Sequence, residues 1–271
     1  MTGYYVFILI MSLAGVVLLA VWLIKTEWGT KALIGSEYRR NFMPDYLPFA
    51  VIFGWLILTA VSSNLLENFV SDYAGWQQKL ITYSGFVAIE IIVIMLILKL
   101  AKLYFVDGLR GFGFRVKKNF SDIITATTIF IVVWPLTLVL LFAVLQIGKM
   151  IAGPEFQIER NEGLTVILEN GQLSLRILML FFAVIITPVF EELVFRGLLQ
   201  SYLRNLNYGP WQSIFIASVI FSVLHPWMHL PAILVLSVAM GYAYEKSGSL
   251  LRPIFVHFLF NGLTIAFALM K

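Results

Sequence analysis

The chain has 271 residues, of which 60% are hydrophobic and 13% charged, and its mean hydropathy is +0.90. A soluble domain is about one quarter charged. This composition therefore excludes a water-soluble globular protein and predicts an all-α, multi-pass protein of the cell membrane. The absence of cysteine excludes disulfides, thiolate metal sites and cysteine nucleophiles. Membrane topology explains the net charge of +4, so no nucleic-acid partner is expected.

Apolar segments of the length that a membrane-spanning helix needs, about 20 residues, recur along the chain. Four spans are predicted at residues 6–24, 47–66, 81–100 and 123–147. A longer fifth span covers residues 173–203, and shorter ones follow at residues 211–224, 230–244 and 254–270. We therefore expect eight transmembrane helices, with re-entrant segments as the alternative for the sixth and seventh.

The loops between these segments alternate in charge. The basic side chains gather in the odd-numbered loops, above all in the first (Lys25, Lys31, Arg39, Arg40) and the third (Lys102, Arg110, Arg115, Lys117, Lys118). The even-numbered loops carry no such excess. The positive-inside rule then predicts that the odd loops face the cytoplasm and that both termini are extracytoplasmic.

Ionisable side chains deep within the predicted spans are few, and each costs a few kcal/mol at the bilayer centre. They are Glu90, Glu191, Glu192, Arg196, His225 and His257. Glu90 stands alone in "VAIEIIV". It is interpreted as a packing polar group, with a brace to Arg196 or to a histidine as the alternative.

Helix geometry distinguishes the charges of the fifth span. Glu191 and Glu192 point in different directions because successive residues are about 100° apart. Glu192 and Arg196 are four residues apart, in the favourable order for an ion pair, so Glu191 needs another partner. Pro188 removes a backbone donor and leaves the carbonyl of residue 184 unpaired, so water or a polar group is expected nearby.

His225 is the candidate partner of Glu191. If the fifth and sixth spans form a hairpin about "NYGPW", the two residues are equidistant from Tyr208, each about 20 Å from the turn. A carboxylate facing an imidazole can act as a general base that holds a water molecule. Phe221 lies one turn from His225 on the same face and could shape the site, whereas His229 is expected at a helix end.

The last span contains "HFLFN", which places His257 and Asn261 on one helix face. Two side-chain donors directed at one point are what a tetrahedral oxyanion requires. A polar contact between helices is the alternative. His257 follows Pro253 closely and would lie at a shallow depth, so either the preceding loop dips inward or the helix starts within the membrane.

Together "EELVFR", "FSVLH" and "HFLFN" resemble the CAAX-protease and bacteriocin-processing family of intramembrane endopeptidases, over roughly residues 170–265. The resemblance implies proteolysis at or within the membrane. Glu191 and His225 would activate water, and His257 and Asn261 would stabilise the oxyanion. Glu192, Arg196 and Phe221 would support these side chains.

The resemblance also divides the chain. Residues 1–150 would form four variable N-terminal transmembrane helices, residues 151–172 an extracytoplasmic loop, and residues 173–271 the catalytic bundle. The expected partners are the lipid bilayer and a protein or peptide substrate, with or without a lipid group. Eukaryotic relatives cut three residues from prenylated proteins, but prenylation of the substrate does not follow here.

Two other functions were weighed against proteolysis. A proton- or ion-coupled transporter could use Glu90, Glu191 and His225 as a relay, but no internal repeat is present and the "HFLFN" pair stays unexplained. A non-catalytic membrane partner, such as a bacteriocin-immunity protein, is the second.

No cofactor is expected. Glu191, His225 and His257 could supply three zinc ligands. However, they come from three helices, and Asn261 shares the face of His257. A metal-independent glutamate mechanism is therefore favoured over zinc.

Overall fold

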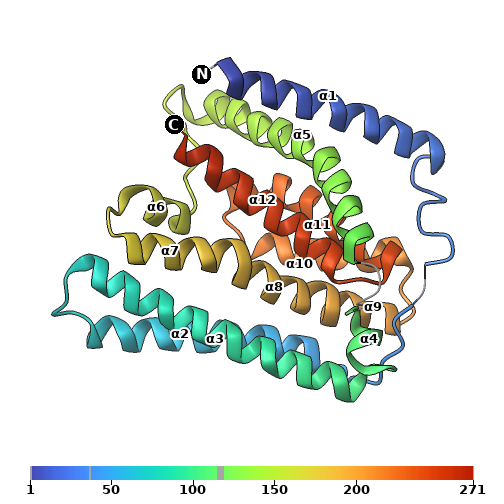
Figure 1. Ribbon diagram of the computed structural model, residues 1–271, viewed down its shortest axis with the longest axis horizontal. Coiled ribbons are helices and arrows are strands. Elements are labelled where there is room, and N and C mark those ends of the chain that lie inside the picture. The colour runs from blue at the N-terminus through green and yellow to red at the C-terminus, as the bar shows by residue number, and fades with distance from the viewer. Residues whose placement is uncertain (1, 37, 115–118, 271) are drawn as a thin grey trace.

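The computed structural model describes residues 2–36, 38–114 and 119–270 (Figure 1). Within these ranges the chain is helical and contains no strand, apart from an isolated bridge between Asn41 and Phe105. The expected all-α fold is therefore confirmed. The predicted loop cations Arg115, Lys117 and Lys118 lie outside the described residues.

All eight predicted apolar segments are helical. The first four correspond to α1 (Thr2–Lys25), α2 (Leu47–Phe69), α3 (Gly75–Tyr104) and α5 (Asn119–Ala152). The fifth is an unbroken helical rod made of α7 (Leu173–Phe181), the π-helix η2 (Phe182–Ile186), α8 (Thr187–Glu192), the π-helix η3 (Leu193–Gln200) and α9 (Ser201–Asn205). The last three are α10 (Pro210–Val223), α11 (Leu230–Ser247) and α12 (Leu251–Leu269). Short helices α4 (Gly108–Phe112), α6 (Glu162–Glu169) and the 3-10 turn η4 (Trp227–His229) complete the fold.

Six helices in the described part of the chain are long and apolar enough to cross a membrane: α1, α2, α5, the rod from Leu173 to Asn205, the segment Trp227–Ser247 that includes α11, and α12. The predicted count of eight spans is thus not confirmed, since α3 and α10 are not among these six. The sixth predicted segment, α10, has 14 residues and rises only about 21 Å, less than the roughly 30 Å of a hydrocarbon core.

The outer surface of the helices is apolar, as contact with a lipid bilayer requires. On α1 the side chains of Ile10 and Val17 are each 61% exposed. Water-soluble proteins rarely expose a continuous apolar surface of this kind. The opposite face of α1 packs on α5, where a Cβ at Gly15 would lie 2.3 Å from the carbonyl oxygen of Ile131. A glycine at this contact lets the two helix backbones approach closely.

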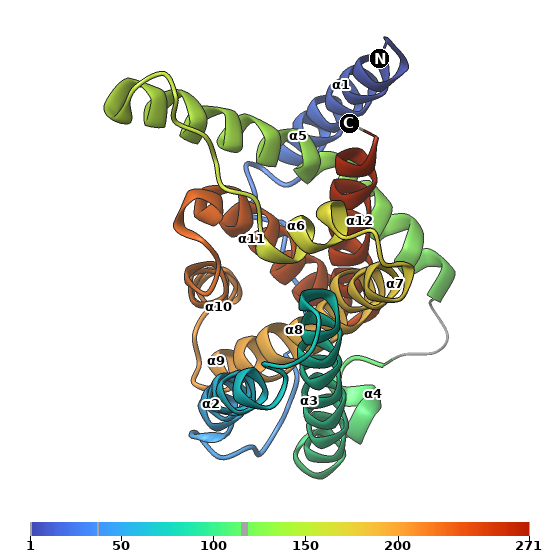
Figure 2. The ribbon, with the colours of Figure 1, turned by 90° about the vertical axis from the view of Figure 1, so that its left-hand side faces the viewer.

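The helices form layers along the long axis of the molecule (Figure 1). α1 and α5 lie at one edge, α2 and α3 at the other, and the rod from α7 to α9 runs between α3 and α12. The end-on view in Figure 2 shows α12 and α11 between α5 and that rod. The fifth predicted segment is therefore the central element of the fold.

Loop contacts follow the predicted alternation. The first loop meets the third at the Asn41–Phe105 bridge. The third meets the seventh where the Leu250 amide donates to the Gly113 carbonyl at 3.1 Å. His229, before α11, bonds to the Glu159 carbonyl in the fourth loop at 2.9 Å. Odd loops thus contact odd loops and even loops contact even loops. Which end faces the cytoplasm stays a prediction.

The predicted loop at residues 151–172 is partly folded. Asn161 caps α6, accepting from the Gly163 amide at 2.8 Å. Val166 on α6 is buried in a cluster with Leu175 and Met179 of α7. The amphipathic α6 therefore covers one end of the central rod.

Candidate active site

The "EELVFR" motif lies in a helix whose hydrogen-bond register is interrupted by two π-helical segments. Glu191 and Glu192 end the short α8, which stands between the π-helices η2 and η3. A π-helical turn inserts an extra residue and is often found at functional sites. Here it redirects the carboxylates relative to a regular helix running through the same segment.

The predicted ion pair of Glu192 and Arg196 is confirmed. Arg196 Nη1 donates to Glu192 Oε1 at 3.0 Å, and the side chains are 1% and 0% exposed. Arg196 Nη2 donates to the Ser237 hydroxyl at 2.8 Å and to the Ser237 carbonyl at 3.2 Å on α11. A buried ion pair is stable only when such additional hydrogen bonds satisfy the remaining donors.

The ion-pair partner of Glu191 differs from the prediction. His257 Nε2 lies 3.6 Å from Glu191 Oε2, and no ion pair joins Glu191 to His225 among the described residues. The other ring nitrogen of His257, Nδ1, is 3.0 Å from Glu192 Oε1. The cause is packing: α12 contacts α8 directly, whereas α10 packs against η3 and α9, further along the rod. His257 therefore lies between the two adjacent carboxylates.

His257 is only 4% exposed, although α12 starts at Leu251, close before it. The residues before α12 are themselves buried, with Ser249 2% and Leu250 0% exposed, and Leu250 bonds to Gly113. Gly113 has a φ of 129°, a left-handed conformation that favours glycine. The seventh loop thus packs against the third and is buried within the protein.

Phe221 is the aromatic centre of the site. Its ring centroid lies 4.7 Å from that of His225 and 6.1 Å from that of His257, and the Arg196 guanidinium stands 4.9 Å from it. The expectation that Phe221 shapes the site is thus supported by direct contacts. One ring places both imidazoles and the guanidinium around a common point.

His225 is held more loosely than His257. It is half-buried in the turn after α10, and its Nδ1 is 3.0 Å from the Phe221 carbonyl. A carbonyl only accepts, so this contact assigns the proton to Nδ1 and leaves Nε2 with a free lone pair.

Pro188 and Asn261 act together. The Thr187 amide bonds to Phe182, five residues back. In this register the donor for the Ala183 carbonyl would be residue 188, and proline has no N–H. Asn261 Nδ2 donates to that carbonyl at 2.8 Å. The expected polar group near the orphaned carbonyl is present, but the π register moves the orphan from residue 184 to Ala183.

The two donors of "HFLFN" therefore contact the protein itself. One N–H of Asn261 is directed at Ala183 and its second N–H remains available. With Nδ1 bonded to Glu192, His257 can donate from Nε2 only as an imidazolium.

Sequence reasoning missed three groups at the site. Ser237 anchors Arg196, and no local pattern marks it. Ala183 accepts from Asn261 through its backbone, which has no sequence signature. Thr187 donates to Glu90 at 3.0 Å. No sequence pattern marks this contact, because it joins two helices that are distant in the chain.

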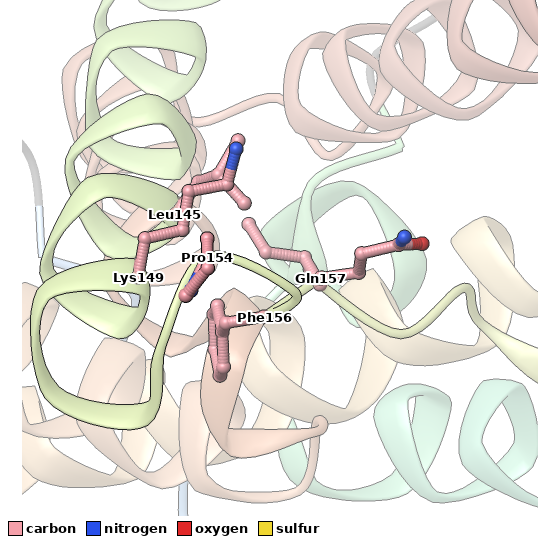
Figure 3. A pocket seen from close by; sticks show the side chains of 6 residues that line it. Leu145, Lys149, Pro154, Phe156 and Gln157 are labelled. Carbon is pink, nitrogen blue, oxygen red and sulfur yellow. The ribbon is translucent and has the colours of Figure 1, made fainter.

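Other features lie apart from this site. A hollow of about 440 Å³ between the end of α5 and residues 154–158 is lined by Leu145, Lys149, Pro154, Phe156, Gln157 and Ile158 (Figure 3). None of the candidate site residues lines it. In the described part of the chain, no group of three or more His, Asp and Glu side chains is arranged to hold a metal ion.

Comparison with known proteins supports the resemblance. Residues 173–263 match the family model for type II CAAX prenyl endopeptidase, Rce1-like. Over 100 residues the chain is 32% identical to the membrane-embedded CAAX protease MroQ of Staphylococcus aureus, covering 35% of this chain and 40% of that one. Over 84 residues it is 29% identical to the uncharacterised protein YpbD of Bacillus subtilis, covering 31% and 42%. No solved structure matches the chain.

The matched segment, residues 173–263, is thus similar to CAAX proteases, which supports the family resemblance that the three motifs indicated. It contains every candidate site residue. The alignments span about two fifths of each of these curated relatives. Helices α1 to α5 lie outside the match.

Proposed function

We propose that this protein is an intramembrane endopeptidase that hydrolyses a peptide bond with a glutamate-activated water. The observation that carries the proposal is the pair of adjacent carboxylates, Glu191 and Glu192, gathered with His257 in a buried membrane site. This site lies within the segment that matches a protease family.

Glu191 is the proposed general base. It is 13% exposed, whereas Glu192 is fully buried and bonded to Arg196. Glu191 therefore retains access to water, and the free Nε2 of His225 can accept a hydrogen bond from the same water. A positioned base of this kind typically contributes 10²–10⁴-fold to a rate.

The proposed reaction conserves protons. Glu191 takes a proton from the water as its oxygen attacks the peptide carbonyl carbon. The resulting oxyanion accepts from Nε2 of protonated His257 and from the second N–H of Asn261. The proton on Glu191 then passes to the leaving nitrogen as the C–N bond breaks. Donors placed where charge develops are commonly the largest contribution to catalysis.

Glu192, Arg196 and Phe221 would support this chemistry without touching the substrate. Glu192 fixes Nδ1 of His257, Arg196 neutralises the adjacent carboxylates, and Phe221 packs against both imidazoles. This accounts for charged side chains in an apolar helix. A proton relay for transport would not require His257 and Asn261 on one face, so proteolysis is favoured.

The proposed substrate is a membrane-associated protein or peptide. The name of the Staphylococcus aureus relative indicates a CAAX protease, which makes lipid-modified peptides the first class to test, beside unmodified ones. The direct experiment incubates purified protein with both peptide classes and compares wild type with Glu191→Gln. Cleavage that Glu191→Gln abolishes supports the proposal, and cleavage retained by Glu191→Gln contradicts it.

A further inference from the structure

Glu90 is a buried carboxyl that the proposed reaction does not use. It lies halfway along α3, outside the segment that matches the protease family, and is 3% exposed. The structure does not show the expected alternative of a brace to Arg196 or a histidine. Glu90 Oε2 instead accepts a hydrogen bond from the Thr187 hydroxyl at 3.0 Å.

Thr187 is a sensitive point of the central rod. It is the first residue of α8, directly after η2 and before Pro188, and Glu191 follows four residues later. Residues four apart share a helix face. The contact with Glu90 therefore holds α8 from the α3 side, while His257 of α12 holds α8 from the other side and Asn261 holds the preceding η2. A six-residue helix between two π-helices depends on such side-chain contacts for its orientation.

The charges around Glu90 disfavour its ionised form. Among the described residues, no Lys, Arg or His forms an ion pair with it. The ionisable acidic and basic side chains of α3 and of the helices packed against it are Lys79, Lys99 and Lys102 of α3, Glu67 of α2, Arg110 of α4, Arg176 of α7, Glu191 and Glu192 of α8, and Arg196 of η3. Of these, Glu191 is the acid that shares a helix face with Thr187, the residue that Glu90 contacts. An unpaired buried carboxylate is costly in a membrane, whereas a carboxylic acid still accepts from Thr187.

We propose that Glu90 is a positioning residue for Glu191 and that it is protonated in the resting protein. As a neutral acid it holds Thr187 and so orients the helix face that carries Glu191. Because it is neutral, Glu191 remains the ionised carboxylate of the pair and can act as the base. Neighbouring acids that differ in protonation are how such sites assign separate roles. The positioning role rests on the proposed protease function.

The test compares three variants by peptide hydrolysis, with Glu191→Gln as the inactive reference. Glu90→Gln is a neutral isostere that still accepts from Thr187, so its kcat should stay within about threefold of wild type. Glu90→Leu removes the acceptor and Thr187→Val removes the donor. Each should lower kcat roughly tenfold with KM unchanged, the pattern of a misplaced base.

A spectroscopic measurement tests the protonation independently of activity. The infrared difference spectrum of wild type minus Glu90→Gln at neutral pH should contain the C=O stretch of a protonated carboxylic acid. A carboxylate band in its place would overturn the proposal, as would a Glu90→Gln variant that loses as much kcat as Glu90→Leu. If wild type cleaves no peptide, the protease function fails, and the infrared spectrum still decides whether Glu90 is protonated.

Discussion

The two histidines of the candidate site, one on α12 and one after α10, differ in burial and in the contacts that fix them. On the α12 side, His257 is 4% exposed and lies between two carboxylates, one of them bonded to a buried arginine. On the α10 side, His225 is half-buried in a turn, with one bond to its own helix and a ring contact to Phe221. The first side is assembled before substrate arrives, and the second is left open to water. Substitutions on the α12 side should therefore cost stability as well as activity, and those on the α10 side activity alone.

Beside the loss of the base itself in Glu191→Gln, the largest expected effect on activity is that of His225→Ala. Hydrolysis should fall by about 10²–10⁴-fold because the water loses its second anchor. Thermal unfolding in detergent should stay near that of wild type, since His225 is only half-buried. The matched control is His229→Ala, which removes the other histidine of the same turn and should leave activity intact. A large drop in the melting temperature of His225→Ala would contradict the expectation that the α10 side contributes to activity and not to stability.

Glu192→Gln, unlike His225→Ala, should lower the stability of the protein. It leaves Arg196 buried without its ionic partner, and breaking a buried pair typically costs about 3–5 kcal/mol. Denaturant or thermal unfolding of the purified variant measures this loss, with exposed Glu169→Gln as the control. Unfolding midpoints equal to those of Glu191→Gln would show that the two carboxylates are not distinguished as the structure indicates.

Asn261→Ala should lower both turnover and stability, each by less than the variants above. Turnover should fall by roughly 10²-fold through loss of an oxyanion donor, with KM nearly unchanged. The free energy of unfolding should also fall by about 1–3 kcal/mol, since the Ala183 carbonyl loses its hydrogen-bond donor. Raised KM with normal turnover would indicate substrate binding instead.

The smallest effect expected is that of Ser237→Ala. It removes one of the two bonds from Arg196 Nη2 to α11, a hydrogen bond to a charged group. Such a bond contributes about 1.5–3 kcal/mol, and the retained Ser237 carbonyl should limit the loss to the lower end. Unfolding curves provide the measurement. A loss as large as that of Glu192→Gln would mean that α11, rather than Glu192, chiefly stabilises the arginine.

The residues that share one helix could be assigned from the sequence. The four-residue spacing fixed the Glu192–Arg196 pair and placed Phe221 against His225, because helical periodicity determines which side chains share a face. The all-α membrane fold followed from composition in the same way, because long apolar segments can span a membrane only as helices or closed barrels.

Contacts between helices could not be assigned so well. Periodicity does not say which helix packs on α8, so His225 was expected where the structure has His257. Nor does sequence reveal a π register, which moved the orphaned carbonyl to Ala183. The contact of Thr187 with Glu90 on α3 likewise has no sequence signal. Hydrophobicity alone also did not give the number of membrane spans, because a segment such as α10 can be apolar and helical and still be short.

The central claim is that Glu191 activates water without the help of a metal ion. The most direct measurement is hydrolysis of a peptide by purified wild type and Glu191→Gln after prolonged chelation, with metal analysis of the same samples. The account predicts that wild type remains active without a stoichiometric metal and that Glu191→Gln is inactive yet folded. Wild-type activity that is lost to the chelator and restored by one equivalent of zinc would contradict it.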